Sequence, residues 1–274
     1  MPLNAVGHIR KMRGGAQSHL LEADDGNWYV VKFLNNPQHR RVLVNEMIAS
    51  VLLEYLRIPS PQTAFVQVTQ DFLAGCPEIG FQIGGAKVPV APGWHFGSRY
   101  PGNPARIAVY DFLPDQLVRK VVNIEDFRGI LVFDKWAGNA DGRQCIFFRA
   151  MVHATETGDT ARPGFVAWMI DHGFSFNGPN WDFPEAATQG LYPRPVVYEA
   201  VCSLDDFQPW LDLVEHFPEE VIDRAWKCIP ADWIAGEEAD LERLLNRLLE
   251  RRTRVGSMLE ACRKSARNPF PRWR

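Results

Sequence analysis

The sequence has little that points to secretion, to a cysteine-based metal site or to a membrane. Its five cysteines are odd in number, widely spaced and form no CxxC pair, so we expect free thiols in a reducing compartment and no zinc site. The N-terminal stretch MPLNAVGHIRKMRGG has no apolar core of signal-peptide length, and no later run reaches membrane-spanning length. These features predict a cytoplasmic protein without a membrane partner.

An excess of basic residues is also missing. With 30 Lys and Arg against 33 Asp and Glu, the net charge is −3, so the chain lacks the basic field of a dedicated nucleic-acid binder. Nucleic acid is therefore not an expected partner. Apolar residues are plentiful instead: 46% of the 274 residues are hydrophobic, which is enough for a substantial core in one large domain or two small ones.

Strand-like segments dominate the first hundred residues. In SHLLEADDGNWYVVKFL, the turn residues Asp24, Asp25 and Gly26 lie between two β-prone runs, which predicts a hairpin. NEMIASVLLEYLRI, residues 45–58, places apolar residues on one helical face before the sequence PSP ends it. We expect further strands at residues 63–68 and 106–112. The Gly- and Pro-rich stretch 91–104 predicts a long loop.

Helical patterns dominate the second half. IEDFRGILVFDKWAG, residues 124–138, predicts a helix, and a hairpin-like region with NADGRQCIFF and GFVAWMIDHGFSF follows. Near the C-terminus, five leucines share one helical face: Leu241, Leu244, Leu245, Leu248 and Leu249. A strand-rich half before a helix-rich half predicts an α+β protein with an N-lobe at residues 1–112, a C-lobe at 113–274 and a hinge near Tyr110–Asp115.

Two N-terminal motifs are candidates for phosphate binding. RGGAQSH, from Arg13 to His19, has adjacent glycines before a strand, which let backbone amides turn towards an anion; a tight turn without a ligand is the alternative. Lys32 ends the strand WYVVK, and Glu46 follows fourteen residues later in the predicted helix. A strand lysine held by a helix glutamate is how a protein kinase orients ATP phosphates. The alternative is an outward lysine and an acid that complements the helix dipole.

Two later motifs supply carboxylates. Phosphoryl transfer needs a carboxylate to accept the hydroxyl proton and oxygen ligands for Mg²⁺. VFDKWAGNADGRQCIFF offers four candidates: Asp134, Asn139, Asp141 and Gln144. The alternative is that Asp141-Gly142 is only a hairpin turn. Asp171 follows the apolar run AWMI, where a carboxylate needs a cationic side chain or a metal beside it.

Taken in this order, the motifs resemble those of HipA-like kinases, relatives of protein kinases and phosphoinositide kinases. GGAQSHLL is similar to the family's glycine loop, VVKF to its ATP-lysine strand and NEMIASVLLEYLRIPSP to its Asn-Glu helix. FRGILVFDKWAGNADG resembles the helix and loop that end in the catalytic aspartate. WMIDHGFSF resembles the Ile-Asp-Phe-Gly metal motif, with His172 in place of the aromatic residue. The resemblance extends from about Met12 to about Phe176.

The resemblance implies a two-lobed protein-kinase-like fold and an ATP- and Mg²⁺-dependent phosphotransferase that acts on a serine or threonine hydroxyl of a protein. Asp141 would then deprotonate the acceptor, Lys32 would orient the phosphates and Glu46 would hold Lys32. Asp171 and Gln144 are the implied Mg²⁺ ligands. The implied ATP contacts are in the glycine loop, the strand and the hinge, whose backbone would meet adenine: Gly14, Gly15, Ala16, Gln17, Ser18, Lys32, Asp111, Phe112 and Leu113.

One departure from the family pattern leaves an alternative open. In the relatives an asparagine usually follows the catalytic aspartate by five residues, whereas here Gln144 follows Asp141 by three. Asn139 is a second candidate for this amide ligand. The shortened loop supports the alternative of a pseudokinase, a nucleotide-binding interaction module with little or no phosphotransfer. The implied partners are ATP, an unknown protein substrate and, among those that the family allows, an antitoxin-like protein.

Overall fold

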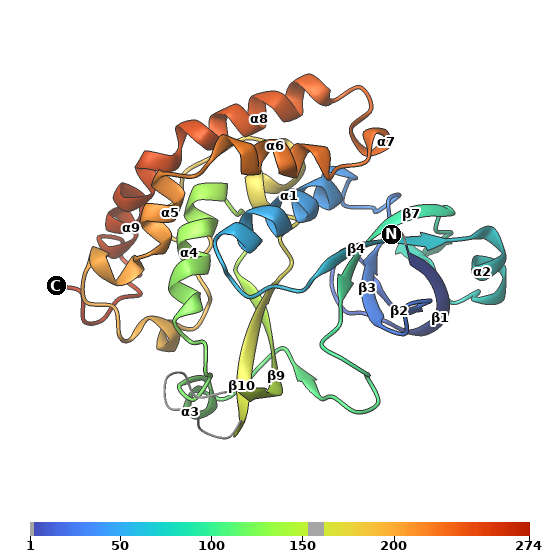
Figure 1. The fold of residues 1–274 in the computed structure, drawn as a ribbon, viewed down its shortest axis with the longest axis horizontal. Coiled ribbons are helices and arrows are strands. Elements are labelled where there is room, and N and C mark those ends of the chain that lie inside the picture. Colours follow the sequence, from blue (N-terminus) through green and yellow to red (C-terminus); the bar gives the residue numbers. More distant parts are fainter. Residues whose placement is uncertain (1–2, 153–161) are drawn as a thin grey trace.

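The computed structural model describes residues 3–152 and 162–274 and combines a closed barrel with a larger helical part (Figure 1). Around the barrel, each strand pairs with the next, in the order β1 (Leu3–Lys11), β2 (His19–Ala23), β3 (Trp28–Lys32), β7 (Gly93–Arg99) and β4 (Thr63–Val68). β4 closes the barrel by pairing in parallel with β1. Two small sheets accompany it: β5 (Phe81–Ile83) with β6 (Ala86–Val88), and β8 (Val109–Tyr110) with β9 (Gln144–Val152) and β10 (Arg162–Ile170).

The helices follow mostly after the barrel. They are α1 (Arg41–Tyr55), α2 (Gln70–Gly75), α3 (Asp115–Val118), α4 (Asp126–Ala137), α5 (Trp210–Glu215), α6 (Glu219–Lys227), α7 (Ala231–Ile234), α8 (Glu238–Glu250) and α9 (Val255–Arg263). Short 3₁₀ turns are η1 (Ser175–Asn180), η2 (Pro195–Tyr198), η3 (Leu204–Phe207) and η4 (Arg252–Arg254). Within the described residues, no helix is long and apolar enough to cross a membrane.

Several predicted elements are confirmed. The hairpin is β2–β3, the strand at 63–68 is β4, and the helix before Gly138 is α4. In α8 the predicted leucine face is buried except for the half-buried Leu249. The strand expected at 106–112 is only two residues long, β8. The mixture of a barrel and helices confirms the α+β class.

The prediction of a long loop at residues 91–104 is wrong. β7 occupies half of this stretch and lies in the barrel wall between β3 and β4. Its glycines allow close packing, since a Cβ on Gly97 would lie 2.7 Å from Cγ2 of Val66 on β4. Glycine here therefore permits a close neighbour rather than a turn.

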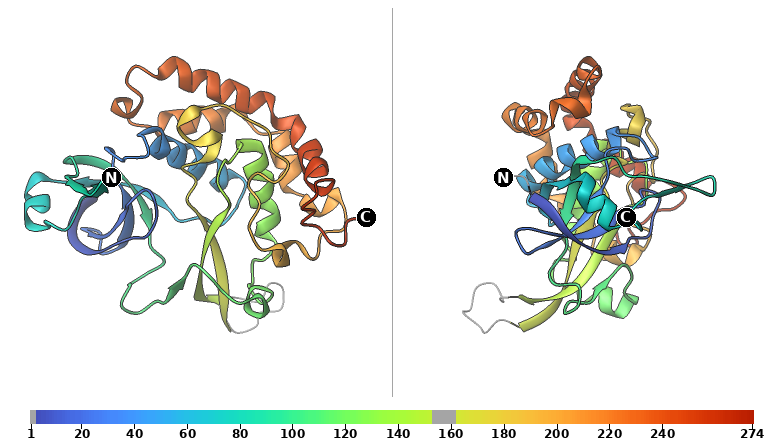
Figure 2. Two further views of the ribbon diagram at one scale, coloured as in Figure 1. Left: turned by 180° about the vertical axis from the view of Figure 1, so that it is seen from behind. Right: turned by 90° about the vertical axis from the view of Figure 1, so that its right-hand side faces the viewer.

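Helix α1 is buried around most of its circumference, although the sequence predicted one apolar face. Eleven of its fifteen residues are buried, because α1 packs against α6 and η1 on one side and contacts β7 on the other. It belongs to the large core of the helical part, whereas a separate small core fills the barrel. Figure 2 shows from behind that α1 lies between the barrel and the C-terminal helices.

Two histidines are buried in the barrel. Nδ1 of His19 lies 2.9 Å from Nε2 of His8, and Nε2 of His19 has no hydrogen-bond partner among the described residues. Nδ1 of His95 accepts a hydrogen bond from the Leu34 N–H. Burial lowers the pKa of each to about 4, with the charge of His8 as a second cause for His19. Both imidazoles are therefore neutral at neutral pH.

We expect the free energy of unfolding to fall as the pH drops from about 7 to about 4, because unfolded histidines take up protons near their ordinary pKa of about 6.5. The folded histidines resist protonation until about pH 4. Urea denaturation at about pH 7.5 and about pH 5 measures the loss. The free energy of unfolding of His19→Phe should fall less between these pH values, because the phenylalanine cannot titrate and keeps the ring contact with Phe33. The exposed His216→Gln is the control, and an equal loss in His19→Phe and wild type would contradict this account.

Candidate active site

Lys32, Glu46 and Asp171 come together between the barrel and the helical part. Lys32 ends β3, Glu46 lies in the second turn of α1, and Asp171 directly follows β10. The Lys32 ammonium donates hydrogen bonds to Oε1 of Glu46 and, at 2.7 Å, to Oδ1 of Asp171. The side chains of Lys32 and Glu46 are almost completely buried, whereas 34% of the Asp171 side chain is exposed. Asp171 is thus the member of the cluster that a ligand can reach.

The charges in this cluster stabilise one another. Burial disfavours the Lys32 ammonium, but the carboxylates of Glu46 and Asp171 outweigh this and raise the pKa of Lys32. Burial likewise raises the pKa of Asp171, but the charge and hydrogen bond of Lys32 outweigh it and hold this pKa below its ordinary value. Lys32 is therefore charged and Asp171 ionised at neutral pH. One ammonium faces two carboxyl groups, which leaves capacity for a further cation.

The backbone at Asp171 is shaped by its contact with α1. Asp171 has a left-handed φ of 59°, which is uncommon outside glycine. Two residues later, the Gly173 N–H donates a 3.1 Å hydrogen bond to Oε1 of Glu46. A Cβ on Gly173 would lie only 2.4 Å from Cγ1 of Val42. Glycine is therefore required there for the segment to reach α1.

A buried ion pair between Arg143 and Asp134 also supports the segment around Asp171. Arg143 binds Asp134 through Nε at 2.8 Å and Nη2 at 2.5 Å, and both side chains are fully buried. Nη1 of Arg143 also donates to the Ile170 carbonyl at 2.8 Å and lies 3.2 Å from Nδ1 of His172. Burial and the charge of Arg143 keep the pKa of His172 well below its ordinary value. The attraction of Asp134 outweighs the desolvation of Arg143 and raises its pKa.

Burial separates the two candidate catalytic aspartates. Asp134 is closed inside its ion pair, whereas Asp141 is exposed and accepts a 2.7 Å hydrogen bond from the Gly142 N–H. Asp141 borders a hollow of about 360 Å³ that is lined by Ala140, Asp141, Gly142, Asn177, Pro184, Glu185, Ala186, Thr188, Gln189 and Gly190. Only Asp141 is therefore accessible to a second reactant.

The two candidate amide ligands also differ in surroundings. Asn139 is buried, with Nδ2 donating to Asp134 and Oδ1 accepting from the Asp141 N–H. Gln144 is exposed, and its Nε2 lies 3.3 Å from Oδ2 of Asp141. Gln144 is paired in the β9–β10 ladder with Ile170, the residue before Asp171. The structure thus places the Gln144 side chain beside Asp141 and its backbone beside the residue before Asp171, while the Asn139 amide is engaged within the loop.

The catalytic-loop candidates and the segment after Asp171 are tied together by their backbones. The Ala140 N–H donates to the Phe174 carbonyl at 2.9 Å, and the Asn177 N–H donates to the Gly138 carbonyl at 3.1 Å. Gly138 ends α4 in a left-handed conformation with φ of 60°. These hydrogen bonds set the position of Asp141 relative to Asp171.

The glycine-loop candidates join β1 to β2. Gly14 has a positive φ of 115°, and a Cβ on Gly15 would lie 2.6 Å from Nε2 of Gln38. The Ala16 carbonyl accepts a 3.2 Å hydrogen bond from Nδ2 of Asn36. The positive φ of Gly14 therefore favours glycine at this position of the loop, whereas the Gln38 side chain could move away from a Cβ at Gly15.

The side chain of Gln17 is already engaged. It accepts a 2.8 Å hydrogen bond from the Gln82 N–H and donates one at 2.9 Å to the Gln82 carbonyl. Ser18, at the end of the loop, is only 6% exposed. The loop is thus fastened to β5 by a side chain, which leaves backbone amides as its means of holding an anion.

The hinge candidates are held by Arg194 rather than by hydrogen bonds from the Lys32 cluster. Asp111, Phe112 and Leu113 follow β8, and the Leu113 carbonyl accepts a hydrogen bond from Arg194. The Arg194 guanidinium also lies 4.6 Å from the ring centroid of Phe112. Within residues 3–152 and 162–274, no hydrogen bond or ion pair joins this segment to the cluster. Their role at adenine stays a prediction.

Asn45 also belongs to this site, although the sequence pattern did not predict a role for it. Its buried amide nitrogen lies 2.8–3.0 Å from the carbonyl oxygens of Gly173, Ser175 and Gly178. Its Oδ1 accepts a 2.8 Å hydrogen bond from Nε1 of Trp181. One helix residue therefore holds the chain that follows Asp171. The available signal was an amide inside the apolar run VLVNEMIASVLL, where a buried polar group needs partners.

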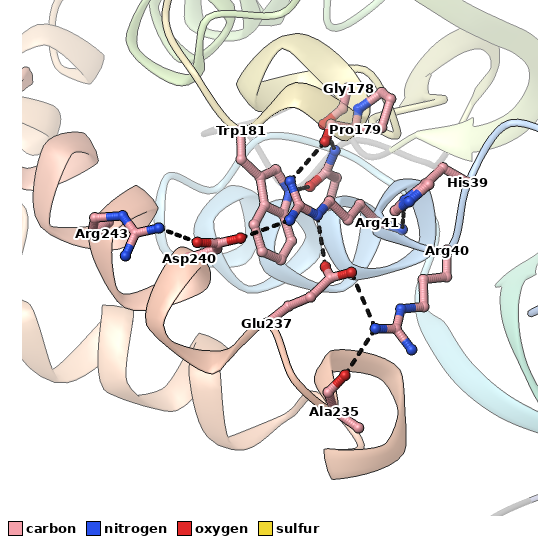
Figure 3. A network of polar contacts seen from close by, with 11 residues as sticks. His39, Arg40, Arg41, Gly178, Pro179, Trp181, Ala235, Glu237, Asp240 and Arg243 are labelled. Atoms are coloured by element: carbon pink, nitrogen blue, oxygen red, sulfur yellow. Dashed lines mark hydrogen bonds and ion pairs between the residues drawn. The ribbon is translucent and has the colours of Figure 1, made fainter.

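Arg41 extends this attachment to α8 (Figure 3). It donates to the Pro179 carbonyl at 2.9 Å, to Glu237 at 2.6 Å and to Asp240 at 3.0 Å, and its guanidinium stacks 4.1 Å from the Trp181 ring centroid. Because α1 begins at Arg41, Glu46 is not at the helix N-terminus. The alternative that Glu46 only complements the helix dipole therefore does not apply.

The two aspartates should respond differently to neutralisation. Asp134→Asn leaves Arg143 buried without a charge partner, so we expect the free energy of unfolding to fall by about 3 to 5 kcal/mol. Asp141→Asn changes an exposed side chain and should alter it by no more than about 0.5 kcal/mol. Urea denaturation followed by circular dichroism measures both. Similar losses in the two variants would mean that Asp134 is not the buried structural acid.

Solved structures with a similar fold include two of the Golgi casein kinase. A crystal structure of the Golgi casein kinase with Mn/ADP bound is similar over 97% of this chain and 73% of its own, at 10% identity and a TM-score of 0.50. A second Golgi casein kinase structure covers 98% and 75%, at 10% identity and a TM-score of 0.49. The first likeness shows a protein-kinase-like fold. Among curated proteins, no sequence matches significantly.

The family of the chain is identified from its sequence. Residues 7–148, more than half of the chain, match the HipA-like kinase family, and they include Lys32, Glu46 and Asp141. The matched region begins in β1 and ends within β9. The chain therefore belongs to the HipA-like kinase family.

Proposed function

We propose that the chain is an ATP- and Mg²⁺-dependent phosphotransferase that acts on a serine or threonine hydroxyl of a protein. The observation that carries the proposal is the pair of hydrogen bonds from Lys32 to Glu46 and to Asp171, residues 14 and 139 positions away. A kinase needs this lysine, this glutamate and this aspartate at one place. Membership of the HipA-like kinase family supports the same activity.

The donor set around Asp171 fits a magnesium-bound nucleotide. Mg²⁺ prefers oxygen ligands and is usually held by one or two carboxylates together with substrate phosphates. The partly exposed Asp171 carboxylate offers such an oxygen, and so does the amide of Gln144, whose backbone pairs with Ile170. In the described chain, no group of three or more His, Cys, Asp or Glu side chains is arranged to hold a metal. Nucleotide phosphates would therefore complete the coordination. The solved neighbour with Mn/ADP bound is consistent with this use of a divalent metal.

The remaining roles follow from charge and accessibility. When bound, Mg²⁺·ATP would supply the phosphoryl group to be transferred. Lys32 would neutralise phosphate charge, and Glu46 would hold the ammonium in place. Asp141 would orient the acceptor hydroxyl in the adjoining hollow and take its proton. The backbone amides of Gly14–Ser18 and the hinge residues 111–113 would contact the rest of ATP.

We further propose that the barrel and the helical part are the two lobes, divided as residues 1–112 and 113–274. Helix α1 lies within the first range, but its packing joins it to the helical part. This helix would therefore connect the lobes. The hydrogen bond between Lys32 on β3 and Glu46 on α1 would place this connection at the nucleotide site.

A pseudokinase is the second candidate, and one observation favours it. The Asn139 amide is engaged by Asp134 and by the Asp141 N–H, so Gln144 alone remains as an amide ligand. With one amide at an unusual spacing, a second metal ion would lack a ligand. This candidate predicts nucleotide binding with little or no transfer.

Incubation with γ-labelled ATP and Mg²⁺ tests the two candidates. We expect the γ-phosphoryl group to pass either to a serine or threonine of the chain, seen as a gain of one phosphate in intact mass, or to water as inorganic phosphate, with release of ADP in both cases. Asp141→Asn and Asp171→Asn should each lower ADP release by at least about 100-fold, as for loss of a general base or a metal ligand. Asp232→Asn, an exposed aspartate outside the site, is the matched control.

Two outcomes would count against phosphotransfer. ADP release at the wild-type rate in both variants would contradict the assigned roles. Thermal stabilisation by ATP without any release of ADP would establish the pseudokinase instead, because binding to the folded state alone raises the melting temperature.

A further inference from the structure

A groove of about 670 Å³ runs between α6 and α8, away from the Lys32 cluster. Figure 1 shows these two helices along the upper edge of the helical part. The apolar part of the groove consists of Ile222 and Trp226 from α6 and Leu245 and Leu249 from α8. Ile222 and Leu245 are buried, whereas Trp226 and Leu249 remain half-exposed. Each helix thus presents an apolar pair four residues apart, on the same side of the helix.

Exposed acids line the same groove. They are Glu219 and Asp223 on α6 and Glu238 and Glu242 on α8. None of the described residues that line the groove is basic. Like charges four residues apart on a helix repel each other, and both helices carry such a pair here. The groove therefore combines an apolar floor with an uncompensated negative rim.

Three basic residues of these two helices interact elsewhere, and the fourth, Lys227 at the end of α6, does not line the groove. Arg224 pairs with Glu54 at 3.3 Å, and Arg243 pairs with Asp240. The Arg247 guanidinium lies 5.2 Å from the ring centroid of Phe183. Within the described residues, none of the four carboxylates of the groove forms an ion pair, although Glu238 accepts a hydrogen bond from the Gly236 N–H.

We propose that this groove binds a basic amphipathic helix of a partner protein. Apolar side chains of such a helix, at three- or four-residue spacing, would contact Trp226 and the leucines, while flanking Lys and Arg would pair with the rim. The volume suits a few anchoring side chains rather than a domain. The proposal is independent of nucleotide binding and of phosphotransfer.

Charge disfavours the other occupants. A second copy that used the same groove would bring acid against acid, and an anionic lipid surface would be repelled. The basic C-terminal segment of this chain is held elsewhere, because Phe270 and Trp273 pack against Phe207 and Phe270 also packs against Tyr198. A basic helix from another protein is the occupant whose charge and shape complement the groove.

The probe is a fluorescein-labelled amphipathic peptide of leucine and lysine, tested against the full chain by fluorescence anisotropy. The groove variant neutralises its four acids: Glu219→Gln, Asp223→Asn, Glu238→Gln and Glu242→Gln. The matched control neutralises four exposed acids outside the groove: Glu215→Gln, Glu220→Gln, Asp232→Asn and Glu250→Gln. We expect wild type and control to bind alike, and the groove variant and Trp226→Ala each to bind at least about tenfold more weakly.

Two results would overturn the proposal. Equal weakening in the groove variant and the matched control would mean that the peptide responds only to total charge. A concentration-dependent dimer that Trp226→Ala dissociates, measured by light scattering, would mean that a second copy fills the groove. The quadruple variants change exposed residues only, so their thermal unfolding should match wild type and exclude misfolding as the cause.

Discussion

The hydrogen bonds that Lys32 donates to Glu46 and Asp171 are the interaction on which the site depends, because they join three separate parts of the fold. Lys32 comes from the barrel, Glu46 from α1, and Asp171 from the end of β10. A buried ammonium without these carboxylates would lose its charge, and a buried Glu46 without the ammonium would be unpaired. Their mutual attraction keeps the Lys32 ammonium charged and the Asp171 carboxylate ionised. An exposed carboxylate is then held beside a fixed cation.

Two buried polar clusters keep that carboxylate in place from opposite sides. Arg143 ties Asp134 at the end of α4 to the Ile170 carbonyl, directly before Asp171. Asn45 holds the carbonyls that follow Asp171. Buried polar groups are costly unless each has a partner, and both clusters meet this condition through backbone acceptors. The result is a site whose position is set mainly by the helical part, since residues of α1, α4 and β10 belong to its large core, whereas the barrel has a core of its own.

The sequence predicted the local elements and the charged triad better than it predicted the supporting contacts. Lys32 and Glu46 could be found because strand and helix periodicities place them, and Asp171 because a charge after an apolar run needs a partner. Arg143 could not be found in this way, because its pairing with Asp134, nine residues earlier, depends on how the intervening loop folds back. The strand β7 was missed because Gly97 signals a turn locally but serves close packing with Val66 in three dimensions. The adenine contacts expected at residues 111–113 depend on how barrel and helices are oriented, which local patterns do not encode.

Electron paramagnetic resonance of Mn²⁺ in the presence of ADP tests the central claim most directly, because it reports metal binding without requiring turnover or an acceptor. The account predicts that wild type binds Mn²⁺ tightly only when ADP is present, and that Asp171→Asn loses this binding while Asp232→Asn keeps it. Equal Mn²⁺·ADP binding by wild type and Asp171→Asn would show that the Lys32–Glu46–Asp171 cluster is a structural ion cluster and not the nucleotide–metal site.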